Sequence, residues 1–244
     1  MSWDNTEART WVFNSGEISY SDEMLPLLSP PKLDLRELAK IQERVAKEVV
    51  QRNGFGKLGT IAGCDVSFAT GNRAYAAGVV LRYRSLEVVD KKVSKVKLKF
   101  PYLPTFLAFR ELEAMLKVLN EVEADVYMVG AQGIAHPRRA GLASHLGVLL
   151  DRPTLGVAKS KLCGEAKEPA KKRGAFSHLK DGRETIGAAV RTREGSKPVY
   201  VSVGHKLSLK TAIRITLETT REHRLPEPLR LAHSLATDAM RDKL

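Results

Sequence analysis

The segment from residue 105 to residue 158 most constrains how this chain can fold, because helix and strand patterns alternate along it. Residues 105–121 have apolar side chains at three- and four-residue spacing, which is typical of an amphipathic helix. The short apolar run at 126–129 predicts a buried strand. A second helix is predicted over 138–151 and a second short strand over 154–158. This alternation predicts parallel strands joined by crossover helices.

The flanking segments complete an α/β pattern. Three strand-like stretches with short links precede the alternating region and predict an antiparallel meander. After it comes a charged loop over 164–173, and then two strands that predict a hairpin around Glu194 and Gly195. The meander is expected over 60–68, 74–83 and 86–100, the hairpin over 184–192 and 197–204, and further helices over 35–49, 208–222 and 227–242. We therefore predict a mixed sheet, with antiparallel strands at one edge and parallel strands in the middle, flanked by helices.

The distribution of charge favours an anionic partner. The net charge is +12, yet residues 1–31 contain five acids and one base, so the remaining chain carries +16. A basic body of this size is typical of nucleic-acid binding, although a solvated basic surface is the common alternative. Residues 1–31 are polar and end in Ser29-Pro30-Pro31, so we interpret them as a loose arm before a single domain over 32–244.

Other sequence features argue against a cysteine-based metal site, a membrane-spanning protein and a secreted protein. The two cysteines, Cys64 and Cys163, have no partner at metal-ligand spacing. No apolar stretch approaches the length of a membrane span, and the N-terminus lacks the pattern of a secretory signal. We expect a cytoplasmic monomer.

Polar residues at strand ends are the candidates for chemistry. Asp65 lies inside an apolar strand, where a carboxylate is costly unless it is paired or binds a metal. His136, Lys159 and His205 each follow a predicted strand, so they could face one crevice. In "KFPYLPTF", two prolines bracket Tyr102 and stiffen the loop. This loop could wedge between bases, or it could be a rigid turn with Tyr102 packed inward.

Four segments, in order between residues 36 and 236, resemble the endonuclease V family. They are "IAGCDVSF", "FPYLPTFLAFRE", "GAQGIAHPRRAGLASHLGVLLDRPTLGVAKSKLCG" and "IGAAVRTREGSKPVYVSVGHKLSL". The resemblance implies a ribonuclease H-like fold and a magnesium- or manganese-dependent repair endonuclease. Such an enzyme hydrolyses the second phosphodiester bond 3′ to a deaminated base, chiefly deoxyinosine in DNA, and in some members inosine in RNA. The products carry a 3′ hydroxyl and a 5′ phosphate.

The resemblance also implies roles for individual residues. Asp65 and Glu111 would bind the metal, His205 would orient or deprotonate the attacking water, and Lys159 would offset phosphate charge. The residues expected to contact nucleic acid are the wedge, Pro101, Tyr102, Leu103 and Pro104, together with His136, Arg138 and Arg139. Gly133, Gly156 and Leu107 are expected to line the pocket for the turned-out base.

Two positions depart from the family pattern. Gly130 stands where the family has a second metal-binding aspartate, and Thr105 stands where it has a glycine just after the wedge. Asp125 cannot substitute for the missing carboxylate, because five residues along a strand span roughly 16 Å and end on the opposite face. Two functions stay open: an endonuclease that the loss impairs, and a non-cleaving binder of inosine-containing nucleic acid.

Overall fold

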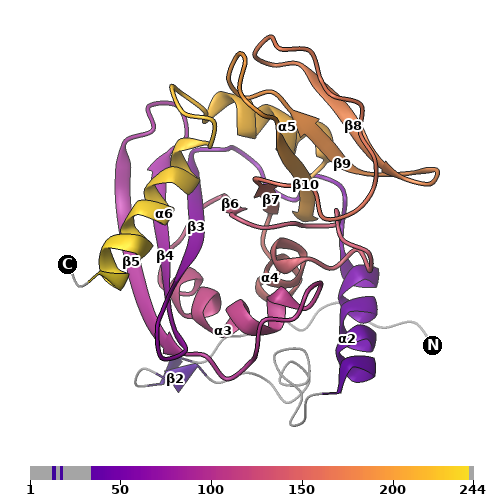
Figure 1. Cartoon of the computed structure of the whole chain (residues 1–244). Coiled ribbons are helices and arrows are strands. Elements are labelled where there is room, and N and C mark those ends of the chain that lie inside the picture. The colour runs from indigo at the N-terminus through magenta and orange to yellow at the C-terminus, as the bar shows by residue number, and fades with distance from the viewer. Residues whose placement is uncertain (1–12, 15–16, 19–33, 242–244) are drawn as a thin grey trace.

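A computed structural model describes residues 13–14, 17–18 and 34–241 of the chain (Figure 1). Most of the arm expected over residues 1–31 lies outside these residues. Its described part consists of two short strands, β1 (Phe13–Asn14) and β2 (Glu17–Ile18), which pair with each other in antiparallel orientation. Within the described part of the chain, every helix is too short or too polar to cross a bilayer.

Eight of the described strands form one mixed sheet. In sheet order they are β5 (Val88–Lys97), β4 (Arg73–Arg82), β3 (Thr60–Ala69), β6 (Val126–Val129), β7 (Thr154–Ala158), β10 (Val199–His205), β9 (Glu184–Val190) and β8 (Phe176–Asp181). The three central strands, β3, β6 and β7, are parallel, which confirms the crossover prediction. The predicted meander is also present, with β4 antiparallel to both β3 and β5.

The second edge of the sheet is antiparallel as well, which the predicted arrangement did not specify. The predicted hairpin forms as β9 and β10, and β10 pairs antiparallel with β7. Strand β8 then pairs with β9 and extends this edge. The sequence pattern missed β8 because Leu179 is the one buried side chain among its six residues, so the strand has no apolar period.

Helices cover both faces of the sheet. On one face, α3 (Leu107–Leu119) and α4 (Leu142–Leu150) pack on a core that includes Cys64 and Val129. On the other face, α5 (Leu209–Glu218) and α6 (Glu227–Met240) pack on a core that includes Ile61 and Met128. Alternate residues of one strand thus enter opposite layers, as the strand period of two requires. Figure 1 shows α6 lying across β3 and β4.

The boundaries of helices α2 and α4 differ from those that the sequence predicts. Helix α2 (Leu35–Glu48) begins after Asp34, whose side chain accepts a hydrogen bond from the Arg36 amide at 2.8 Å, and it packs on α4. It ends before the expected stop at Asn53. Helix α4 begins at Leu142 rather than at residue 138, because Arg139 adopts a left-handed conformation with φ of 56°. Residues 130–141 are therefore a loop between β6 and α4.

Candidate active site

A cavity of about 360 Å³ opens at the level where β6 and β7 end. Asp65 of β3, Gly130 after β6 and Lys159 after β7 line it, as expected for parallel strands whose carboxyl ends meet at one edge of the sheet. His136 lines it from the β6–α4 loop. The sheet therefore brings together four of the predicted site residues or positions.

The predicted wedge forms another wall of this cavity. Tyr102, Leu103 and Pro104 line it together with Leu107 at the start of α3. The side chain of Tyr102 is 66% exposed, so the alternative in which Tyr102 packs into the core is wrong. An exposed aromatic on a proline-bracketed loop lies at the mouth of the cavity.

Two carboxylates lie close enough to perturb each other. Glu111 projects from α3, one turn after the cavity-lining Ala108, and is 8% exposed. Burial, and then the charge of Asp65, raise the pKa of Glu111 to about 8, against a smaller lowering by Arg110. Burial also raises the pKa of Asp65, although His233 and Lys159 partly offset it. Two buried carboxylates in one site favour a bound cation, because a cation would stabilise both charged forms.

His233 of α6 is a site residue that the sequence interpretation missed. Its Nδ1 lies 2.7 Å from Oδ2 of Asp65, although 168 residues separate them. Helix α6 buries Leu229, Ala232 and Ala236 against the sheet, and His233 follows directly on this apolar face. A histidine at the margin of the buried face of a helix is the one signal that could have indicated it.

His205 lies away from this cavity, so its predicted position is wrong. It pairs with Thr154, the first residue of β7, whereas Lys159 follows the last residue of that strand. Because β10 runs antiparallel to β7, the carboxyl end of β10 lies beside the amino end of β7, at the strand ends opposite the cavity. There the Val50 amide donates to Nδ1 of His205 at 3.2 Å, and Nε2 lies 3.4 Å from Oδ1 of Asp151.

Gly130 faces Asp65 across neighbouring strands. The Gly130 amide donates to the Cys64 carbonyl at 3.0 Å, and a β-carbon on Gly130 would lie 2.6 Å from Oδ1 of Asp65. The Asp65 side chain thus fills the space beside Gly130. Asp125 is engaged elsewhere, since its Oδ2 accepts from the Thr60 amide at 2.8 Å, as expected for a residue at the start of the strand. Within the part of the chain that the structure describes, His, Cys, Asp and Glu side chains form no group of three or more that could hold a metal.

The two arginines expected to contact nucleic acid make contacts within the protein. Arg139 forms ion pairs of 2.9 Å with Asp181 and 2.8 Å with Glu184, which attach the loop to the β8–β9 hairpin. The guanidinium of Arg138 lies 4.4 Å from the centre of the Phe106 ring, and its Nε donates to Gln42 at 2.6 Å. Both guanidiniums therefore serve to hold the loop in place.

Gly133 and Gly156 shape the cavity indirectly rather than lining it. A β-carbon on Gly133 would lie 2.0 Å from the Val203 carbonyl oxygen, and one on Gly156 would lie 2.4 Å from the Ala131 carbonyl oxygen. Only glycine lets these backbones approach so closely. The cavity walls that result are formed by Ala131 and neighbouring side chains.

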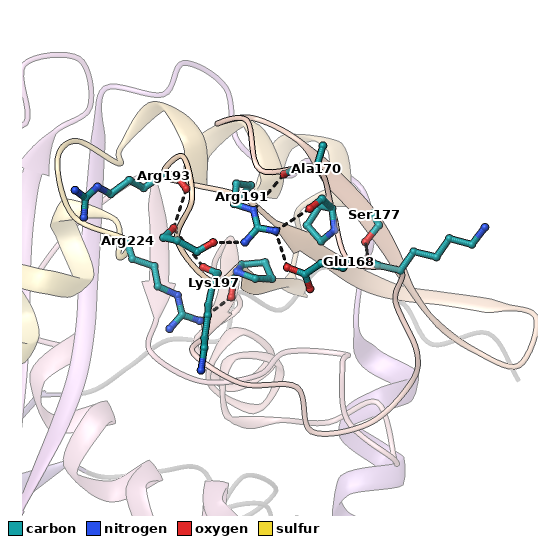
Figure 2. A network of polar contacts seen from close by, with 11 residues as sticks. Glu168, Ala170, Ser177, Arg191, Arg193, Lys197 and Arg224 are labelled. Carbon is teal, nitrogen blue, oxygen red and sulfur yellow. Dashed lines mark hydrogen bonds and ion pairs between the residues drawn. The ribbon is translucent and has the colours of Figure 1, made fainter.

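A hydrogen bond from Arg224 holds the backbone at Lys159 in place. Nη2 of Arg224 donates to the Lys159 carbonyl at 2.7 Å and to the Pro198 carbonyl at 2.6 Å. Figure 2 shows Arg224 beside a second arginine, Arg191, which binds Glu168 at 2.5 Å and the Ala170 carbonyl at 3.2 Å. The Arg224 bonds attach the backbone at Lys159 to the start of β10 and to the loop before α6, and the Arg191 bonds hold the charged loop at 168–170.

Comparison with known proteins identifies the family. The model of the endonuclease V family matches residues 42–234. The chain belongs to the endonuclease V family. It is 49% identical over 202 residues to the endonuclease V of Methanothrix thermoacetophila, which covers 82% of this chain and 89% of that protein.

Solved endonuclease V structures share the fold. The crystal structure from Streptomyces avermitilis has a TM-score of 0.82 at 36% identity, covering 87% of this chain and 95% of that chain. The Ciona intestinalis enzyme, solved with a 24mer DNA containing an inosine followed by a ribo-adenosine, has a TM-score of 0.74 at 29% identity, covering 86% and 99%. The predicted ribonuclease H-like endonuclease V fold is confirmed. Members of the family are metal-dependent phosphodiesterases that act at deoxyinosine.

Proposed function

We propose that this endonuclease V chain binds inosine-containing DNA or RNA at the cavity between β3, β6 and β7. There it hydrolyses the second phosphodiester bond 3′ to the inosine. The observation that carries the proposal is the pairing of Asp65 and Glu111 beside Lys159, at a cavity whose mouth holds the exposed Tyr102. The inosine-containing DNA bound to the Ciona intestinalis relative supports the substrate class.

Each wall of the cavity has a part in this reaction. Tyr102 and Leu103 would part the strands, and the base would turn into the space beside Leu107 and Ala131. Lys159, whose charge already lowers the pKa of Asp65, would offset the charge of the phosphate. His233 would orient or deprotonate the attacking water, the role that we expected for His205, because the His233 imidazole is hydrogen bonded to Asp65.

Asp65 and Glu111 are the residues that would hold Mg²⁺ or Mn²⁺. Their buried, mutually repelling carboxylates fit a divalent cation that keeps several of its own waters. The ion supplies charge neutralisation at the phosphoryl oxygens and lowers the pKa of the attacking water. If Gly130 stands in place of a second metal-binding aspartate, as the resemblance implies, this chain would offer the ion one carboxylate fewer.

That missing carboxylate favours a second candidate function. With Asp65 and Glu111 alone, metal affinity falls, and the chain becomes a non-cleaving binder of the same substrate. Base recognition would persist, because the wedge and the walls formed by Leu107 and Ala131 are all present in this chain. The two functions share a ligand and differ only in turnover.

The deciding experiment incubates the purified chain with a duplex containing one inosine, in Mg²⁺ or Mn²⁺, beside a Gly130→Asp variant. An adenosine-containing duplex and an inosine-containing RNA are run in parallel. Cutting one nucleotide 3′ of the inosine, with 3′ hydroxyl and 5′ phosphate ends, supports the endonuclease. Tight inosine-selective binding that only Gly130→Asp converts to cutting supports the binder. Equal affinity for inosine and adenosine duplexes rejects both.

A further inference from the structure

Thr105 has a backbone conformation that its side chain disfavours. Its φ is 66°, in the left-handed region, where a β-branched residue is a rare outlier. Such strain is of order 1–3 kcal/mol and persists only where the surroundings hold the residue in place. Thr105 follows Pro104 of the wedge directly and precedes α3. The strain thus sits where the wedge joins the body of the protein.

Three side chains from two distant segments hold Thr105. Nε2 of Gln42 donates to the Thr105 carbonyl at 2.8 Å, and Nε2 of His136 lies 2.8 Å from the same oxygen. Nη2 of Arg138 donates to the Thr105 hydroxyl at 2.8 Å. Gln42 and His136 are 1% and 3% exposed, so these bonds are shielded from water. We call Gln42, His136 and Arg138 the clamp.

The other end of the wedge has its own anchor. Nη1 of Arg110 donates to the Phe100 carbonyl at 2.7 Å, one residue before Pro101. Residues 101–104 are therefore fixed at both ends, while Tyr102 between them remains exposed. A loop held in this way does not lose conformational freedom again when it meets a ligand.

We propose that Thr105 is a positioning residue, which sets the wedge for parting the strands of a duplex. This inference rests on the proposed function. The bonds to the carbonyl, including a long one of 3.4 Å from Nη2 of Arg138, need only the backbone of residue 105. The 2.8 Å bond from Arg138 needs the hydroxyl. Serine keeps that hydroxyl and glycine removes it. The side chain of Thr105 acts through the wedge, so it matters where strands must be separated and not where the base is already unpaired.

The test compares the affinity of the full chain for one inosine in a duplex and for the same inosine in a single strand. For Thr105→Gly we expect roughly tenfold weaker duplex binding, about the loss of one hydrogen bond to a charged group, and unchanged single-strand binding. Thr105→Ser should keep the wild-type ratio of the two dissociation constants. Arg138→Ala should change the ratio in the same direction as Thr105→Gly.

Asn72→Gly is the matched control. Asn72 also has a left-handed φ, 54°, and its carbonyl also accepts a backbone hydrogen bond, from Leu98 at 2.7 Å, but in the β3–β4 turn. The control should leave the ratio unchanged. An unchanged ratio of the two dissociation constants in Thr105→Gly, whether both affinities fall equally or neither falls, would overturn the role of the clamp. Inosine selectivity in the same chain would still uphold the proposed function. Loss of selectivity for inosine over adenosine in the unmodified chain would end both proposals.

Discussion

Oδ1 of Asp65 lies 2.6 Å from the point where a β-carbon on Gly130 would stand. Any side chain at residue 130 therefore requires the Asp65 side chain to rotate, which is feasible because the contact is made by its terminal carboxylate and not by backbone. For Gly130→Asp we expect Mn²⁺ affinity to rise by at least about tenfold, since a third carboxylate joins Asp65 and Glu111. Calorimetric titration with Mn²⁺ measures this directly.

Gly130→Ala distinguishes the effect of the added carboxylate from the effect of displacing the Asp65 side chain. It adds the β-carbon without a ligand, so Mn²⁺ affinity should stay at or below that of the unmodified chain. An alanine variant that binds Mn²⁺ as tightly as the aspartate variant would contradict this assignment.

The two histidines should respond differently to replacement. In His233→Ala, Asp65 loses the hydrogen bond and the charge that lower its pKa, so its metal-binding form becomes less populated and Mn²⁺ affinity should fall. His205→Ala should leave Mn²⁺ affinity unchanged. It should instead reduce the free energy of unfolding by about 1–3 kcal/mol, because His205 is buried and accepts a hydrogen bond from the Val50 amide. The reverse pattern would return His205 to the site.

Arg224 should act on nucleic acid through Lys159. Arg224→Ala removes the donor to the Lys159 carbonyl and weakens inosine-duplex binding, whereas Arg221→Ala, at an exposed neighbour, should not. If the effect passes through Lys159, Arg224→Ala should cost much less in a Lys159→Ala background. The dissociation constants of the unmodified chain, the Arg224→Ala and Lys159→Ala variants and the double variant give the coupling between the two residues. Additive losses would show that Arg224 acts independently.

Stability should depend on the ionisation of His136. The pKa of His136 is lowered to about 4, mainly by burial and less by the charges of Arg138 and Arg139, against a raising by the hydrogen bond with the Thr105 carbonyl. The Arg138 amide donates to Nδ1 at 3.2 Å, so protonation of that nitrogen breaks this bond. The unfolded chain, with an ordinary histidine pKa near 6.5, binds the proton first. Stability is therefore complete above about pH 6.5 and declines as the pH falls towards 4.

Urea unfolding between pH 4 and 7.5 measures the decline, which should be on the order of 3 kcal/mol at most. Asp65 and Glu111 titrate as well, so the comparison uses His136→Gln, in which the amide nitrogen can still donate to Thr105. The unmodified chain should lose more stability than this variant between pH 6.5 and 4. Parallel curves would exclude His136 as the cause.

Apart from β8, the sequence alone determined which segments become helices and strands, and it indicated several of the residues that carry chemistry. Val126–Val129 is apolar throughout, and Thr154–Ala158 is apolar after its first residue, which predicts buried central strands. Asp65 stood out because a carboxylate within an apolar strand needs a partner. Such inferences succeed because they depend on periodicity and on the cost of burying charge, and both are local properties of the chain.

Only the tertiary structure decided which residues meet. His205 ends a strand, as Lys159 follows one, yet the antiparallel direction of β10 places the two at opposite edges. His233 reaches Asp65 because α6 lies across β3, and Thr105 is held in a left-handed conformation by side chains 63 and 31 residues away. Local pattern cannot specify these contacts, because strand direction and helix placement result from packing the whole sheet at once.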